Sequence, residues 1–263
     1  MALLDLRAEA QAHKPVLREM PHLKEAAIGT WRGRMINEFS SARVFDGLAR
    51  QFAAAGVHDV VDEVKGFAAE ERRHGVLCGA VVEALGGEAL AAVPDGDEYP
   101  EHDDATPLEA ALRNMLSICC LSETVAVSLI GAERIEMPEG ELRELLTKIF
   151  SDEVGHSRFG WRTLGRLAPA LDPALKDRLG DYLEVAFDHL VEHELAHLPA
   201  SSRPPADGVV LGLCSGSDAR KLFFDTVESV IVPGLEAHGI PASRAWSRVV
   251  AAAASEAWAE RSN

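Results

Sequence analysis

The sequence predicts an all-α fold, and three observations carry this prediction. Ala, Leu, Glu and Arg, which are strong helix formers, crowd segments in which apolar residues recur about every 3.6 positions. Aromatic residues make up only 6% of the chain, so strand-forming types are scarce. Gly, Pro and Asp gather between the periodic segments, where helices end. With 263 residues, of which 47% are hydrophobic, the chain is long enough to bury a full core.

The first two helices are expected from about Thr30 to Ala55 and from about Asp59 to Leu85. Glycine follows each of them and supplies a stop signal. Glu38 lies on the apolar face of the first helix, and Glu71 and His74 lie on that of the second. Because the connection is short, these helices should form an antiparallel hairpin.

A polar stretch rich in Pro, Gly and Asp, from Gly87 to Ala105, is too long for a tight turn and is expected to cross over to a second hairpin. Thr106 to Glu109 has the sequence of a capping box and should begin the third helix, which carries Glu123. After Met137-Pro138, a fourth helix is expected to run to about Leu167.

Three more helices are expected in the last third of the chain. Asp172-Pro173 should cap a fifth helix that ends near His197. After a loop from Pro204 to Gly216, two further helices are expected over about Ser217 to Val232 and Pro241 to Glu260.

The overall charge and the cysteines limit the environment and the partners. A formal net charge of -16 predicts neither a nucleic-acid nor a membrane partner, because such binding relies on clustered Lys and Arg. The 4 cysteines lack both paired C-x-x-C spacing and the density of a disulfide scaffold, which predicts a reducing, cytoplasmic location. Charged residues interrupt the segment from Met1 to Pro15, so it does not resemble a signal peptide, and no stretch is expected to reach membrane-spanning length.

Two Glu-x-x-His motifs, Glu71/His74 and Glu153/His156, lie in the middle of predicted helices. This spacing puts carboxylate and imidazole on one helix face, about one turn apart, where both can reach one metal ion. A helix with a single inward-facing glutamate precedes each motif, so the chain repeats one pattern. Two further copies suit a helix interior less well, because Glu19/His22 contains Pro21 and Glu194/His197 lies in a last helical turn before Pro199.

From Thr30 to Leu167 this pattern resembles the ferritin-like superfamily of di-iron and di-manganese carboxylate bundles, which includes rubrerythrins, the ribonucleotide reductase small subunit and aldehyde-deformylating oxygenase. The resemblance implies two metal ions, bridged by Glu71 and Glu153. Four carboxylates then balance two divalent ions, and iron and manganese suit these ligands equally. The six implied ligands are Glu38, Glu71, His74, Glu123, Glu153 and His156.

The resemblance also sets the expected organisation of the chain. We expect an N-terminal arm over residues 1–29 and a ferritin-like di-metal four-helix bundle, with its long crossover, over residues 30–167. Residues 168–263 should form additional C-terminal helices that pack on the bundle within the same domain, where they either cover a pocket or form a dimer contact.

The function implied by the resemblance is that of an oxidoreductase, with two iron ions or a mixed manganese and iron pair. It would activate dioxygen or peroxide and oxidise a small organic substrate. An external electron donor can take part in the reaction, and the chain can form a homodimer. The implied catalytic residues are Glu38, Glu71, Glu123 and Glu153. Two alternatives stay open. The first is a ferritin-like protein that oxidises and stores iron or detoxifies peroxide, and the second is a non-catalytic helical binding protein with a vestigial site.

Departures from known relatives narrow the function. The chain has no C-x-x-C pair for a rubredoxin-type iron. Neither Tyr99 nor Tyr182 falls on the predicted inward faces, which argues against a radical-generating role. Ile149 stands where the arylamine N-oxygenases have an extra histidine, which argues against that chemistry.

Other polar residues favour simpler interpretations. His189, His193 and His197 recur every four residues and can form a second metal site, but a solvated helix face is favoured. Cys78 and Cys119 are expected to pack in the core. Arg72 and Arg73 can neutralise Glu70 or Asp152 or can face only water, and water is slightly favoured.

Overall fold

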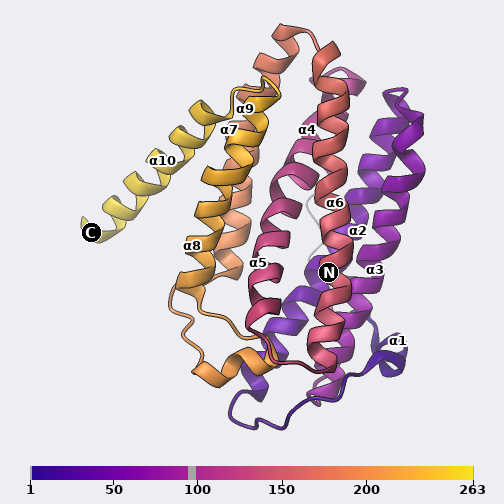
Figure 1. Ribbon diagram of the computed structural model, residues 1–263, viewed down its shortest axis with the longest axis vertical. Coiled ribbons are helices and arrows are strands. Elements are labelled where there is room, and N and C mark those ends of the chain that lie inside the picture. Colours follow the sequence, from indigo (N-terminus) through magenta and orange to yellow (C-terminus); the bar gives the residue numbers. More distant parts are fainter. Residues whose placement is uncertain (1, 94–98, 263) are drawn as a thin grey trace. The chain divides into compact units, whose positions relative to one another are not determined.

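The all-α prediction is confirmed in the computed structural model, which describes residues 2–93 and 99–262 (Figure 1). Strands in these ranges are limited to β1 (Ala2–Asp5) and β2 (Leu90–Val93), which pair antiparallel with Ala2 opposite Val93 and Asp5 opposite Leu90. Both strands fall in segments that the sequence predicted as arm and crossover.

Helices form the rest of the regular structure. Two π-helical stretches, Leu116–Ser122 and Val227–Ile231, join α4 to α5 and α8 to α9, so that each pair runs as one continuous helical segment. Short 3₁₀ turns cover Gln11–His13, His58–Val60, Ala168–Ala170 and Ala206–Leu211. The α-helices are α1 (Arg7–Ala10), α2 (Lys24–Ala54), α3 (Val61–Ala84), α4 (Pro107–Met115), α5 (Glu123–Glu136), α6 (Glu141–Leu167), α7 (Pro173–His197), α8 (Gly216–Thr226), α9 (Val232–Ala237) and α10 (Ala242–Ser262).

Most helix ends lie close to their predicted positions because the stop signals act as expected. Gly56 and Gly86, which follow α2 and α3, have φ of 76° and 78°, the left-handed conformation that glycine adopts without strain. Asp172 caps α7 by accepting a hydrogen bond from the Ala174 amide at 2.8 Å. The main difference is that α2 begins at Lys24, because Ala27, before the predicted start, is already buried in the core.

The chain divides into two compact units. Unit 1 comprises Met1–Ala111, Ile130–Glu153 and Arg203–Ser215, and unit 2 comprises Leu112–Leu129, Val154–Ser202 and Gly216–Asn263. The helices α5 and α6 therefore contribute residues to both units.

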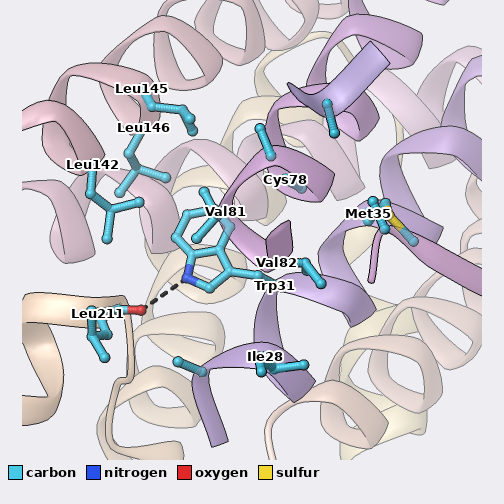
Figure 2. Close-up of a cluster of buried hydrophobic side chains, with 14 of the residues drawn as sticks. Ile28, Trp31, Met35, Cys78, Val81, Val82, Leu142, Leu145, Leu146 and Leu211 are labelled. Atoms are coloured by element: carbon cyan, nitrogen blue, oxygen red, sulfur yellow. Dashed lines mark hydrogen bonds between the residues drawn. The ribbon is translucent and has the colours of Figure 1, made fainter. Parts of the chain in front are cut away.

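The core of unit 1 is built on the α2–α3 hairpin and the first half of α6. Trp31 of α2 is fully buried among aliphatic side chains of α3 and α6, and its indole Nε1 donates a hydrogen bond to the Leu211 carbonyl at 2.9 Å (Figure 2). A Cβ added to Gly75 of α3 would lie 3.4 Å from the Met35 carbonyl oxygen, so this glycine lets α3 approach α2 closely. The hairpin and α6 thus form a close-packed support for side chains on their facing surfaces.

Unit 2 is also tightly packed around the second half of α6. A Cβ added to Gly160 would lie 2.6 Å from the Cys119 Cβ. This is a steric overlap, so the close approach of the two segments requires glycine at this position. Thr124 links to α6 twice, because its hydroxyl lies 2.9 Å from the Ser157 hydroxyl and accepts a 3.0 Å hydrogen bond from the Trp161 indole. These contacts fix the segment around Thr124 against α6.

Within the described ranges, one helical segment, Pro107–Glu136, is long and apolar enough to cross a membrane by length and composition. The expectation that no stretch reaches this length is therefore wrong. Core helices of soluble proteins pass the same test, and 44% of the apolar window is buried inside the protein, so the segment is weak evidence for a membrane span.

Candidate metal centre

Three helices of unit 1 bring four of the predicted ligands together. Glu38 comes from α2, Glu71 and His74 from α3, and Glu153 from α6. One potential ligand atom from each lies within 4.8 Å of all the others. Their side chains are only 1% to 12% exposed, so water cannot solvate the charges well.

The imidazole of His74 lies close to all three glutamates of this cluster. Its Nδ1 lies 3.2 Å from Glu153 Oε1, 3.6 Å from Glu38 Oε2 and 3.9 Å from Glu71 Oε1. Nδ1 and three carboxylates therefore converge on one small volume, as the ligands of a metal ion do.

Asp152, which the sequence analysis did not place in the site, holds the other nitrogen of His74. Its Oδ2 lies 3.0 Å from His74 Nε2. Because an ionised carboxylate can only accept, Nε2 is the donor, and in neutral imidazole the lone pair is then on Nδ1, which faces the glutamates. The only signal in the sequence was that Asp152 directly precedes Glu153.

The negative charge of the three glutamates favours the binding of a cation in the cluster. Burial alone lowers the pKa of His74, but the neighbouring carboxylates of Glu153 and Glu38 outweigh this effect and raise the pKa to about 11. Without a metal ion, His74 is thus an imidazolium that partly balances three buried carboxylates. Buried carboxylates are costly unless paired, so a divalent cation fits this set of donors.

The neighbouring arginines are ion-paired rather than solvated. Arg73 lies 3.2 Å from Asp152 and 3.7 Å from Glu70, and Arg72 pairs with Asp46. The expectation that both arginines face only water is therefore wrong, although each side chain is about half exposed. Through Asp152, Arg73 becomes part of the chain of contacts that fixes His74.

Unit 2 brings the other two predicted ligands together. Glu123 Oε2 lies 3.8 Å from His156 Nδ1, and both side chains are buried, at 9% and 0% exposure. Glu123 comes directly after the π-helix Leu116–Ser122, and its amide donates to the carbonyl of Ile118, five residues earlier. A π-turn shifts the register of the residues that follow it, and such turns are frequent at functional sites. Sequence periodicity gave no sign of it.

The six predicted ligands thus form two groups. Unit 1 gathers Glu38, Glu71, His74 and Glu153, and unit 2 gathers Glu123 and His156. His156 follows Glu153 by one turn of α6.

Other residues singled out in the sequence have identifiable surroundings. Cys78 and Cys119 are fully buried, as expected for core residues, and burial raises the pKa of the Cys78 thiol well above its ordinary value. The Tyr99 hydroxyl donates to Gln51 Oε1 at 2.8 Å, and the Tyr182 ring lies 5.4 Å from the Arg113 guanidinium.

The three spaced histidines all lie on α7, where His189 and His197 are exposed and His193 is partly buried. Burial lowers the pKa of His193 to about 4, and the nearby imidazoles of His197 and His189 contribute to the decrease.

Comparisons with known proteins give no further guide to the site. No protein family, no curated protein and no solved structure matches this chain.

Proposed function

We propose that the chain is a ferritin-like di-metal oxidoreductase, which uses two iron ions, or one manganese and one iron, to activate dioxygen or peroxide and oxidise a small organic substrate. The observation that carries the proposal is the buried cluster of Glu38, Glu71, His74 and Glu153. Its carboxylate and imidazole donors suit iron and manganese. Their origin in a Glu helix and two Glu-x-x-His helices follows the pattern of di-iron carboxylate bundles.

The six residues take distinct roles in this proposal. Glu38 and His74 would hold one ion, and Glu123 and His156 would hold the other. Glu71 and Glu153 would supply carboxylates to both sets. Support for the second set comes from the 3.8 Å approach of Glu123 to His156 and from the one-turn spacing of Glu153 and His156 on α6.

Bound iron would supply the redox chemistry, which is electron transfer to dioxygen or peroxide. The chain's own residues prepare the site for it. Asp152 accepts a hydrogen bond from Nε2–H of His74 and so keeps Nδ1 directed at the cluster. Burial of the three glutamates excludes water, which strengthens every electrostatic contact among them.

Metal content followed by optical spectroscopy tests the proposal. Protein purified without oxygen should contain close to two irons per chain, and admission of dioxygen should produce the absorption band of an oxo-bridged ferric pair. Glu71→Ala should lose most of this iron, because it removes the proposed bridge. Glu63→Ala changes an exposed glutamate of the same helix and should keep it.

Two results would count against the proposal. Retention of both ions by Glu71→Ala would remove the bridging role, and wild-type protein that takes up no iron would favour a vestigial site.

A further inference from the structure

The end of α7 carries a second arrangement of imidazoles, which shares no residue with the carboxylate cluster. His189, His193 and His197 recur every four residues, and the last two enclose Glu194 in the sequence His-Glu-Leu-Ala-His. On a helix, two histidines four residues apart lie on one face, and this is a spacing by which helices bind zinc.

The ring distances distinguish the two histidine pairs. The ring centres of His193 and His197 lie 4.7 Å apart and the planes are inclined at 70°, whereas those of His189 and His193 lie 6.2 Å apart. Two imidazoles that share one tetrahedral zinc ion, with Zn–N bonds of about 2.0–2.1 Å, have ring centres about 5 Å apart. The His193/His197 pair is therefore close to the geometry that a shared ion needs.

The backbone beneath this pair is held in helical form up to its last turn. The Leu198 amide donates to the Glu194 carbonyl at 3.0 Å, which closes the turn that contains His197. Arg220 donates to the Leu195 carbonyl at 2.9 Å and also to the Leu198 carbonyl, and so binds carbonyls that the helix itself leaves unsatisfied. Little ordering of the backbone would then be needed when an ion binds.

We propose that His193 and His197 form a binding site for a divalent transition-metal ion of the zinc class. His197 is exposed and His193 is partly buried, so an ion can reach the pair from solvent. Over the described ranges of the chain, no set of three His, Cys, Asp or Glu ligands converges on α7. The protein thus supplies two ligands and water fills the remaining positions, which is the open coordination that leaves a metal ion accessible to small molecules.

Calorimetric titration with zinc chloride tests this site in the full-length protein. The wild type should bind one zinc ion that His193→Ala and His197→Ala each bind at least about tenfold more weakly, since even the loss of an outer contact to a metal ligand typically costs that much. His189→Ala is the matched control, because it removes an exposed imidazole from the same helix and should leave this zinc ion in place. All three variants should have the same helical content as the wild type by circular dichroism, which shows that they are folded.

Metal binding by Glu71→Ala and by the histidine variants, measured side by side, distinguishes this site from the carboxylate cluster. Glu71→Ala should lower metal binding at the cluster but leave the zinc ion that depends on His197 unchanged. The inference is overturned if His193→Ala and His197→Ala bind zinc with the same stoichiometry and affinity as His189→Ala.

Discussion

His74 contributes the imidazole of the cluster in unit 1. Its two ring nitrogens face different partners, with Nδ1 toward three glutamates and Nε2 toward Asp152. Sequence periodicity placed His74, Glu38, Glu71 and Glu153 on inward faces, and the structure gathers them. Asp152 was missed because a contact between helices depends on how two helices are rotated about their axes, which the spacing within one helix does not determine.

Asp152→Asn tests the orienting role of Asp152 at His74. The amide keeps the size of the side chain but loses the charge that fixes the Nε2 proton, so iron affinity should fall about 10- to 100-fold. Affinity can be measured by competition with a coloured chelator. Asp188→Asn, an exposed change on α7, should have no effect. Equal affinities of Asp152→Asn and wild type would exclude the role.

The raised pKa of His74 predicts how metal binding depends on pH. In metal-free protein the pKa is about 11, so a metal ion must displace a proton at neutral pH, and affinity should rise by up to about tenfold per pH unit as pH increases. The imidazolium stabilises metal-free protein fully below the ordinary value of 6.5, and this contribution is lost as pH rises toward 11.

Calorimetry in buffers of different ionisation enthalpy measures this proton release directly. At pH 8 the wild type should release at least one proton per cluster loaded, and His74→Ala should release fewer. Absence of any buffer dependence would contradict the assigned protonation of His74.

At the scale of elements, the positions of the helices could be predicted from the sequence, but the π-helix and the two strands could not. Helix formers, a capping box at Thr106 and left-handed glycines are local signals, and these predicted the helices well. The strands β1 and β2 were missed because four-residue stretches rich in Ala and Leu resemble helix, and their pairing is between segments far apart in the chain. The π-helix before Glu123 was missed because it is a change in hydrogen-bond register, which the apolar pattern does not encode.

Glycines of α6 allow a matched test of packing in unit 2. Gly160→Ala should lower the free energy of unfolding by about 1–3 kcal/mol, because its new Cβ would overlap Cys119 atoms that lie 2.6 and 2.9 Å away. Gly155→Ala has no atom within 4 Å of its new Cβ, so it should raise the stability by up to about 1 kcal/mol through helix propensity. Urea unfolding of metal-free protein measures both, and a similar midpoint for the two variants would contradict the close contact.

At the scale of the whole molecule, the acidic character of the chain agrees with a role in binding cations. The net charge of -16 attracts metal ions and repels polyanions. Both compact units contribute buried Glu and His pairs, while the histidine pair of α7 adds a partly exposed group of donors. The sequence could predict the residue types of the ligands because they repeat along the chain, but no pattern in it identifies a substrate.

The central claim is that Glu38, Glu71, His74 and Glu153 hold a metal ion, and anomalous X-ray diffraction at the iron absorption edge tests it most directly. Crystals of iron-loaded protein should show an anomalous peak about 2 Å from His74 Nδ1, in contact with the glutamate oxygens. Iron-loaded crystals without anomalous density among these four side chains would contradict the account.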